Sequence, residues 1–382
     1  MDSDSTALPA PLVPGQPWTV LAPMQDITTL AFMRIIARHG APDWFVTEFI
    51  RVHAASTPNP DILDSLERND TGRPVFAQLI GESPEHMART ASSLLKKRGN
   101  PIRSFGPGAQ SQANSRNPSG AGHSVAGIDL NLGCPVPKVF RKNVGGGLLR
   151  DLHRVDILLD ALRSATAGRL FTVKTRTGFD NSEYFPTLLE LINLHDVDLL
   201  TVHGRTVRGL YRSPVDYEAI ALAVRTVQCP VVANGDITSA EKAVQVLKQT
   251  GCAGLMVGRH AVRNPWIFRQ IRERLAGLPV FQPCFGDVRA YVDELVAATA
   301  TSEASSERHA ARMKKFLNFV GVSVDPDGAF LDAMRRAPDL DTLLRVCDAH
   351  LTENGRATHP FPQEPYETVL ARPNYENQED MG

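Results

Sequence analysis

Cysteines are scarce in this chain, and long apolar runs are absent. Five of the 382 residues are cysteine, an odd number at irregular spacing, with no CxxC pair and no histidine and cysteine cluster at zinc-ligand spacing. This pattern predicts neither a disulfide framework nor a bound metal, and it fits a reducing cytoplasm. No stretch approaches the roughly 18 consecutive apolar residues of a membrane span, so we expect no membrane association.

A net charge of either sign is also missing. The 41 lysines and arginines nearly balance 42 aspartates and glutamates, for a formal charge of -1. This balance argues against wholesale binding of polyanions but allows a local basic stripe. The 42% hydrophobic content is enough for a sizeable core in one large domain and a smaller one. The acidic, proline-rich segment 1–17 is unlike a signal peptide and predicts a flexible lead-in.

Short β-rich runs alternate with segments of helical spacing. Near-continuous apolar strands of this kind predict a parallel sheet covered by helices, and eight such units within about 250 residues favour a (β/α)8 (TIM) barrel at 18–280. A doubly wound open sheet is the alternative, but it calls for a glycine-rich fingerprint that "APMQDIT", after the first strand, lacks. The predicted strands are 19–24, 44–50, 74–81, 127–134, 171–178, 199–206, 230–237 and 253–260; helices are predicted at 84–97, 155–166, 217–227 and 239–250, the last with Ser239 as its N-cap.

Two segments break the alternation. Residues 98–126 are rich in Gly, Ser, Pro and Asn and poor in large apolar residues, so we expect a disordered insertion. Because it precedes a strand, it belongs at the N-terminal face of the barrel, away from the chemistry. From 285 to 355 the pattern is wholly helical, which predicts a C-terminal all-helical domain, followed by a tail at 356–382. The expected class is α/β, with this second domain.

Polar residues stand at the C-terminal ends of nearly all the predicted strands. In a barrel these ends carry the loops that build active sites. One polar residue at a strand end is ordinary, whereas a full ring is hard to explain by stability alone. The ring consists of Met24 and Gln25, Glu48 and Arg51, Gln78, Asn131 and Cys134, Lys174 and Arg176, His203 and Arg205, Asn234 and Asp236, and Gly258 and Arg259.

The ring has the chemistry to hold a flavin. Lys174 would be an unpaired buried cation without an anionic partner, and a reduced flavin carries negative charge near N1 and the C2 carbonyl. Gln78 can both donate and accept at the edge of the flavin ring. The runs "ANGDI" and "VGRHA" have the small residues of a phosphate cradle, with Arg259 for charge. The alternative for Lys174 is a salt bridge to Glu48 or Asp129.

A cysteine and three glycines follow the fourth predicted strand, in "NLGCPVPKVFRKNVGGGLL". A free cysteine is most often a small buried hydrophobe, so the position alone carries no function. The flanking Gly133 and Pro135 would hold the sulfur of Cys134 in place. Gly145–Gly147 would let the loop move over a substrate.

Eight stretches between residues 19 and 270 occur in an order typical of one family. They are "LAPMQDIT", "TEFIRV", "AQLIG", "DLNLGCPVPKV", "VKTRTG", "VHGRT", "ANGDI" and "VGRHAVRNP". With "ARMKKFLNF" near the C-terminus, they resemble the tRNA-dihydrouridine synthases. The resemblance implies an FMN-dependent reduction of the C5=C6 bond of a tRNA uridine, with NADPH as reductant, by a barrel with a helical tRNA-binding domain.

Roles for site residues follow from the resemblance, position by position. It implies that Cys134 donates a proton to C5 after hydride reaches C6; a thiol with a free pKa of about 8.5 is mostly protonated at neutral pH. Asn131, on the same side of the strand, would hydrogen-bond the uracil edge. The flavin would be lined by Pro23, Met24, Gln25, Gln78, Lys174 and His203, and its phosphate would be held by Asn234, Gly235, Asp236, Gly258 and Arg259.

A basic helix predicts contact with RNA. The target base lies inside a folded tRNA and must be flipped out, so the protein grips the backbone elsewhere. Arg308, Arg312 and Lys315 share one helix face, with Lys314 beside them, although a solvated helix face is the alternative. The expected tRNA contacts are Arg51, Asn131, Tyr211, Arg312, Lys314, Lys315 and Phe319.

Within the family, "TEFIRV", "HGRTVRGLYR" and "ARMKKFLNF" look most like the C-type branch, which acts on uridine 16 of the D-loop. Phe316 and Phe319 depart from that pattern, so the target base stays open. Two other functions also stay open: an FMN barrel that reduces free pyrimidines, and an inactive tRNA-binding module. The first has no use for a basic helical tail, and a colourless protein would favour the second. The sequence does not fix the oligomeric state, and a monomer is the expectation.

Overall fold

The computed structural model describes residues 16–96, 125–301 and 304–371. They fall into two compact units: the described residues of 1–30, 42–236 and 245–257, and those of 31–41, 237–244 and 258–382. Nearly all of the predicted lead-in and insertion, and the end of the predicted tail, lie outside the described residues. The predicted domain boundaries therefore stay a prediction.

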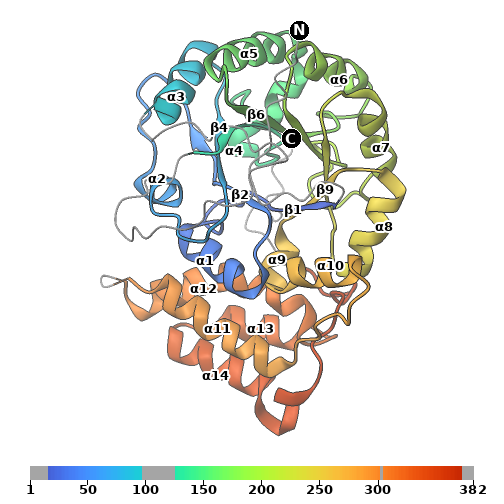
Figure 1. Ribbon diagram of the computed structural model, residues 1–382. Helices are drawn as coiled ribbons and strands as arrows, with labels where there is room; N and C mark the ends of the chain where they lie inside the picture. Colours follow the sequence, from blue (N-terminus) through green and yellow to red (C-terminus); the bar gives the residue numbers. More distant parts are fainter. Residues whose placement is uncertain (1–15, 97–124, 302–303, 372–382) are drawn as a thin grey trace, which may run out of the picture. The chain divides into compact units, whose positions relative to one another are not determined.

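Parallel strands of the first unit close into a barrel (Figure 1). Strand β1 pairs with both β2 and β9, and β2 pairs with β4, so β1, β2 and β4–β9 form a continuous eight-stranded ring. The additional strand β3 pairs with β4. The predicted (β/α)8 barrel is confirmed. The strands are β1 Trp18–Leu21, β2 Trp44–Val46, β3 Ile50–Arg51, β4 Val75–Ile80, β5 Gly127–Leu132, β6 Leu170–Arg176, β7 Leu199–His203, β8 Val231–Asn234 and β9 Gly254–Val257.

The predicted strand 44–50 is wrong in one respect, because it is interrupted into β2 and β3. Between them, the side chain of Thr47 accepts a hydrogen bond from the backbone N–H of Gln78 (3.1 Å), and that of Glu48 accepts from the N–H of Asp26 (2.9 Å). Side chains thus take backbone donors at the point where the ladder stops. The other seven strands begin within one residue of the predicted start and end earlier than predicted.

Helices of the first unit surround the strands (Figure 1). In α5, the side chain of Asp151 accepts from the N–H of Arg154 (3.2 Å) as the N-cap, and the buried residues recur at helical spacing. This pattern lets one face of the helix pack inward while the other stays in water. The helices are α2 Pro60–Glu67, α3 Pro84–Lys96, α4 Pro137–Phe140, the 3-10 helix η1 Gly145–Arg150, α5 Leu152–Ala165, α6 Phe185–Leu194 and α7 Tyr217–Thr226.

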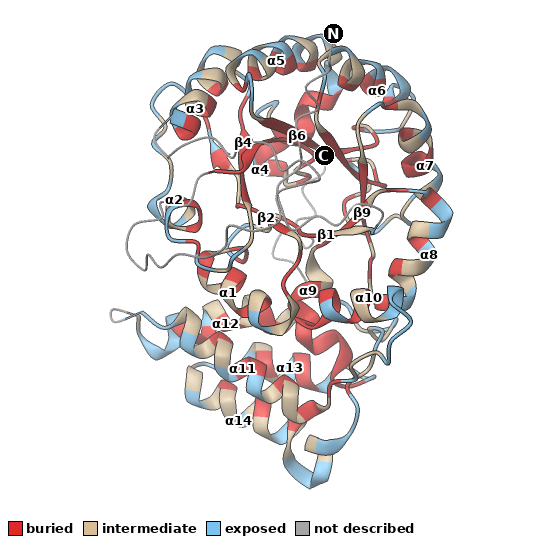
Figure 2. Ribbon diagram, in the orientation of Figure 1, coloured by how far each residue is buried: buried red, intermediate tan, exposed pale blue. Residues whose placement is uncertain are grey.

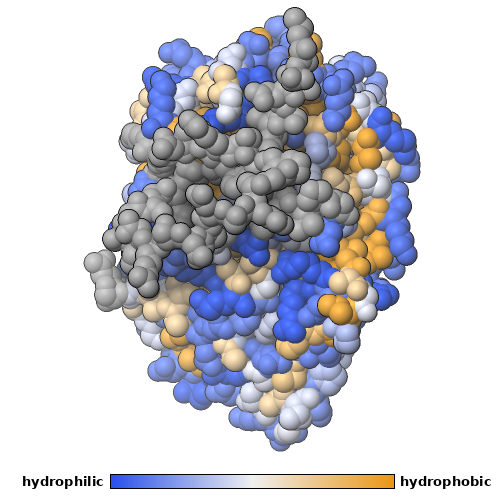
Figure 3. All heavy atoms as spheres, viewed as in Figure 1, coloured by the Kyte–Doolittle hydropathy of each residue, from blue (hydrophilic) through white to orange (hydrophobic). Residues whose placement is uncertain are grey.

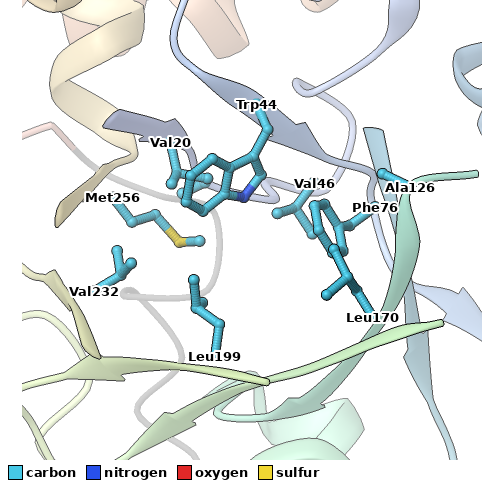
Figure 4. Packing of buried hydrophobic residues seen from close by; sticks show 10 residues of the cluster. Val20, Trp44, Val46, Phe76, Ala126, Leu170, Leu199, Val232 and Met256 are labelled. Atoms are coloured by element: carbon cyan, nitrogen blue, oxygen red, sulfur yellow. The ribbon is translucent and has the colours of Figure 1, made fainter. Parts of the chain in front are cut away.

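The barrel strands are largely buried (Figure 2), and their interior holds a cluster of apolar side chains that includes the first inward-facing residues of β4, β6 and β7 (Figure 4). We call this cluster the apolar layer; its buried residues are Val20, Ala22, Trp44, Val46, Phe76, Ala126, Leu170, Leu199, Val232 and Met256. Successive side chains of a strand point to opposite faces. Residues two positions after Phe76, Leu170 and Leu199 therefore also face inward, and they are polar: Gln78, Thr172 and Thr201.

The second unit is helical, as predicted for the C-terminal region. The predicted N-cap Ser239 is confirmed, because its hydroxyl accepts from the N–H of Lys242 (3.1 Å). Helices α1 and α8 have residues in both units. The elements are α1 Leu30–Gly40, α8 Ala240–Thr250, α9 Arg259–Arg263, α10 Ile267–Leu275, α11 Phe285–Thr299, α12 Ser306–Val320, η2 Gly321–Ser323, α13 Ala329–Arg336, α14 Leu340–Leu351 and η3 Glu353–Thr358.

Apolar residues are scattered over the described surface. On the face shown in Figure 3, the described atoms are mainly hydrophilic, with smaller hydrophobic patches between them. Within the described ranges, no helix has the length and the apolar character needed to cross a membrane.

Candidate active site

A layer of polar side chains follows the apolar layer toward the C-terminal ends of β4, β5 and β6. The register of the parallel pairs aligns Gln78 with Asp129, Asp129 with Thr172, and Asn131 with Lys174. All of these side chains except Lys174, which is partly exposed, are buried. Neighbouring strands therefore bring together Gln78, Asn131 and Lys174, the three residues that the sequence predicts to meet the flavin or the base.

Hydrogen bonds join this polar layer across three strands. Gln78 Nε2 donates to Asp129 Oδ2 (2.7 Å), and the hydroxyl of Thr172 donates to Asp129 Oδ1 (2.5 Å). Asn131 Nδ2 donates to Gln78 Oε1 (2.8 Å). A buried polar group is costly unless it is hydrogen-bonded, so these contacts make the polar layer compatible with the barrel interior. Asp129 was absent from the predicted site, although it stands two residues before Asn131 in "DLNLGC".

Asn131 also fixes the loop that carries Cys134. Its Oδ1 accepts from the backbone N–H groups of Gly133 (3.0 Å) and Cys134 (2.9 Å). The glycines 145–147 are buried, and the N–H of Gly146 donates to the Cys134 carbonyl (3.3 Å). A Cβ on Gly146 would lie 2.8 Å from that oxygen. In this conformation the glycines allow two backbone segments to pack closely, and the expected movement of the loop stays a prediction.

Electrostatics at the site favour an ammonium group beside a neutral thiol. Burial lowers the pKa of Lys174 to about 8, helped by the charge of Arg176 and opposed by that of Asp129. Burial raises the pKa of the Cys134 thiol. Among the described residues, Lys174 forms no salt bridge with Glu48 or Asp129, the alternative that the sequence left open. At neutral pH, Lys174 therefore carries a charge without a bonded carboxylate.

Arg176 braces the rim of the site, a role that sequence reasoning missed. Its Nε donates to the carbonyl of Gly133 (3.1 Å), and its Nη1 donates to the carbonyls of Thr206 (2.7 Å) and Leu210 (2.6 Å). Its guanidinium carbon lies 5.2 Å from the ring centroid of Tyr211. This buried cation ties the loop after β5 to the loop after β7.

His203 is held by a second arginine. Arg205 donates to both carboxylate oxygens of Asp236 (3.2 and 2.5 Å), and its Nη1 lies 3.3 Å from His203 Nε2. The rings of His203 and Tyr211 are 6.0 Å apart between centroids. The structure thus places Tyr211 beside His203. Because the carboxylate of Asp236 is paired with Arg205, Asp236 would bind a phosphate through its backbone N–H more readily than through its side chain.

The loop after β8 needs its glycine. Gly235 has a φ of +121°, and a Cβ there would lie 3.0 Å from His203 Cδ2. The side chain of Asn234 is turned to the carbonyl of Met256 (2.8 Å). Gly258 and Arg259, the N-cap and first residue of α9, belong to the second unit, so a phosphate site shared with them stays a prediction.

The remaining predicted barrel residues lie on loops and strand ends. Pro23, Met24 and Gln25 follow β1, and the N–H of Met24 donates to the hydroxyl of Thr28 (3.0 Å). Gln25 is exposed. Arg51 is exposed at the end of β3, as a tRNA contact requires.

Two predicted tRNA contacts in the helical unit have partners inside the protein. Arg312 Nη1 donates to the carbonyl of Thr299 (2.5 Å), the last residue of α11. Lys314 Nζ donates to the carbonyls of Arg335 (2.9 Å) and Ala337 (2.6 Å) at the end of α13. Both cations thus satisfy carbonyls that a helix leaves open at its C-terminus. A role of these two residues in binding tRNA stays a prediction.

The other residues of the same helix divide by exposure. Arg308 is exposed, and Lys315 and Phe319 are partly exposed. Phe316 is buried, with its ring centroid 5.5 Å from that of Phe32. Of the two aromatics that depart from the C-type pattern, only Phe319 is therefore open to a partner.

Fold and site together define a TIM-barrel protein with a polar site at the C-terminal ends of its strands. A family model described as "Dihydrouridine synthase (Dus)" matches residues 20–98 and 118–313. The chain belongs to the dihydrouridine synthase family.

Known proteins resemble the chain over most of its length. A "Probable tRNA-dihydrouridine synthase" of Helicobacter pylori is 34% identical over 263 residues, 69% of this chain and 72% of that protein. A "tRNA-dihydrouridine(16) synthase" of Neisseria meningitidis is 28% identical over 337 residues, 86% of this chain and 93% of that protein. A solved structure of a variant of NCR from Zymomonas mobilis covers 69% of this chain and 88% of its own at 14% identity, with a TM-score of 0.47.

Proposed function

We propose that this protein is a tRNA-dihydrouridine synthase, which reduces the C5=C6 bond of uridine 16 in the D-loop of tRNA with FMN as cofactor and NADPH as reductant. The observation that carries the proposal is the arrangement of Cys134, Asn131 and Lys174 at one end of the barrel. It combines a protonated thiol, a fixed amide and a cation. Family membership and the names of the relatives support the substrate.

The residues present fit a flavin. Lys174 supplies a positive charge that no carboxylate among the described residues neutralises by a salt bridge. Gln78 adds an amide that can donate and accept. The absence of a side chain at Gly235 avoids a close contact between a Cβ and the ring of His203. When bound, the flavin supplies the hydride that is added to C6 of the base. Pro23, Met24, Gln25, Gln78, Lys174 and His203 would line it, and Asn234, Gly235, Asp236, Gly258 and Arg259 would hold its phosphate.

Cys134 supplies the proton that completes the reduction. Its raised pKa keeps the sulfur in the thiol form at neutral pH, so it can donate to C5 as a general acid. Asn131 Oδ1 already accepts two backbone N–H groups, and one Nδ2 hydrogen is given to Gln78. The second Nδ2 hydrogen is therefore the group that Asn131 would offer to a carbonyl of the uracil.

The tRNA would be held at the barrel rim and along α12. Arg51 ends β3 and Tyr211 lies on the loop after β7, at the C-terminal strand ends where a flipped base would enter. Arg308 is exposed on α12, whereas Arg312 and Lys314 donate to carbonyls at helix ends, so Arg308 would contact phosphates in preference to Arg312 and Lys314, with Lys315 on the same helix face. With tRNA as substrate, we expect the protein in the cytoplasm, acting as a monomer.

A spectrum and a kinetic assay on the purified full-length protein test this function. We expect a yellow protein that releases FMN on denaturation and whose NADPH oxidation is stimulated by unmodified tRNA. A colourless protein that FMN does not reconstitute would point to the tRNA-binding module. Stimulation by free uracil or uridine, and not by tRNA, would point to the pyrimidine reductase.

A further inference from the structure

A buried carboxylate lies at the centre of the polar layer, and the proposed chemistry gives it no role. Asp129 is on the inward face of β5, 2% exposed, between Gln78 on β4 and Thr172 on β6. Acidic side chains are rarely buried to this extent unless they are paired. Its partners are an amide and a hydroxyl, and among the described residues it forms no salt bridge.

The hydrogen bonds that lead to Asp129 have a forced direction. The backbone N–H groups of Gly133 and Cys134 can only donate, so the atom of Asn131 that they meet is its oxygen. Asn131 therefore turns its nitrogen to Gln78, whose oxygen accepts. The amide of Gln78 is then left with its nitrogen pointing to Asp129, which must accept.

Position 129 must therefore carry a hydrogen-bond acceptor for the Gln78 Nε2 group. The hydroxyl of Thr172 donates to the second carboxylate oxygen. Burial raises the pKa of Asp129, while hydrogen bonds from Gln78 and Thr172 and the charge of Lys174 oppose the rise. The negative charge of Asp129 in turn raises the pKa of Lys174 and partly offsets the effect of burial.

We propose that Asp129 is a positioning residue of the active site, which anchors the Gln78 amide by a second hydrogen bond and so holds in place the donors and acceptors that flavin and base meet. The inference rests on the proposed function for its consequence, and on the hydrogen bonds alone for its geometry. Without Asp129, the Gln78 amide would keep only its hydrogen bond from Asn131 and could turn away from the position in which it meets the flavin.

Four variants of the full-length chain test the proposal. Asp129→Val removes the acceptor and introduces a β-branched residue suited to a strand. Asp129→Ser is a smaller, polar alternative in case the Val variant does not fold; its hydroxyl ends one bond short of the carboxylate oxygens and so does not take the place of the acceptor that Gln78 meets. Asp129→Asn keeps one oxygen for Gln78 and gives Thr172 a donor, so it should restore the geometry. Thr172→Val is the matched control, because it deletes the other hydrogen bond to the same carboxylate and leaves that of Gln78.

The first measurement needs no flavin. In protein labelled with nitrogen-15 at glutamine and stripped of flavin, we follow hydrogen exchange of the Gln78 side-chain amide, assigned with Gln78→Glu. Loss of a buried hydrogen bond predicts exchange about tenfold faster in the Val and Ser variants. Asp129→Asn and Thr172→Val should stay within about twofold of the wild type. Unchanged exchange in the Val and Ser variants would overturn the proposal.

The second measurement is the dissociation constant and visible absorption spectrum of added FMN. We expect a roughly tenfold weaker affinity and a shifted absorption maximum for Asp129→Val and Asp129→Ser, and values near the wild type for the Asn variant and the Thr172→Val control. Faster amide exchange with an unchanged FMN affinity and spectrum would overturn the link to the active site. If the wild type itself binds no FMN, the proposed function fails, and the exchange data alone decide whether Asp129 positions Gln78.

Discussion

The two halves of the barrel interior are built on the same strands and differ in what their side chains do. In the apolar layer, Phe76, Leu170 and Leu199 fill space with apolar atoms (Figure 4). Two residues further along the same strands, Gln78 and Thr172 form directed hydrogen bonds in the buried interior. Packing needs only shape and volume, whereas each group of the polar layer must find a partner.

This contrast separates stability from chemistry along the strand. Substitutions in the apolar layer should lower the free energy of unfolding, while the molecules that still fold should keep the binding and catalytic properties of the site. Changing the polar layer should alter binding or reaction more than stability. Mutations in each layer test this difference.

The largest effect is expected from Cys134→Ala. Removing the general acid should lower the rate of dihydrouridine formation by about 100-fold or more, while FMN content and tRNA affinity stay near the wild-type values. Turnover of a tRNA transcript by the purified variant measures this. The control is Cys229→Ala, which removes a thiol just before β8 at the opposite end of the strands. Wild-type turnover by Cys134→Ala would remove this residue from the mechanism.

A comparable loss, but of stability, is expected from Phe76→Ala in the apolar layer. Truncating a buried phenylalanine should lower the free energy of unfolding by about 3–5 kcal/mol, because it leaves a cavity. Denaturant unfolding of the full chain measures the change. The folded fraction should keep its FMN affinity, and a selective loss of FMN binding with unchanged stability would contradict the division between the layers.

Lys174→Met should weaken FMN binding by about tenfold, the scale of one charge-assisted interaction. The wild type should also show a pH dependence. The ammonium group of Lys174 is present below its pKa of about 8 and is lost above it, so the affinity for FMN should fall as the pH rises through this pKa. A titration of FMN binding from about pH 6.5 to about pH 9.5, on both sides of that pKa, should show this step in the wild type and none in the variant. The same step in both would assign it to another group.

The smallest effects separate packing from recognition in the helical unit. Lys314→Ala removes donors to two carbonyls at the end of α13, and it should cost about 1 kcal/mol of stability. Arg308→Ala, at an exposed position of α12, should leave stability nearly unchanged and lower the slope of log affinity for tRNA against log salt by up to about one. Thermal unfolding and tRNA binding at several salt concentrations distinguish the two variants. A steeper loss of tRNA binding for Lys314→Ala than for Arg308→Ala would reverse the assignment.

The sequence predicted the barrel because apolar strands and amphipathic helices alternate between residues 19 and 260. It did not predict the interruption at Thr47 and Glu48, since nothing local shows that these side chains take the N–H groups of Gln78 and Asp26. The motif residues Cys134 and Asn131 were found from their place at a strand end. The direction of the amide chain through Asp129 was not, because it depends on contacts between residues about 50 positions apart.

The bracing arginines and the glycine turn were missed for the same reason. Arg176 and Arg205 stand in the predicted ring, but only the folded loops show the carbonyls and the carboxylate that they bind. Three consecutive glycines are typical of a mobile loop as well as of a close contact. The Cβ position at Gly146, 2.8 Å from the Cys134 carbonyl, shows that close contact applies here.

Base-resolved mapping of dihydrouridine is the most direct test of the proposed function. An unmodified tRNA transcript is incubated with the purified protein, FMN and NADPH, and every uridine is then scored for reduction. The account predicts dihydrouridine at position 16 with the wild type, and almost none with Cys134→Ala. Reduction at another D-loop position would correct the target base. No reduced uridine at any position, with a protein that binds FMN and tRNA, would contradict the proposed function.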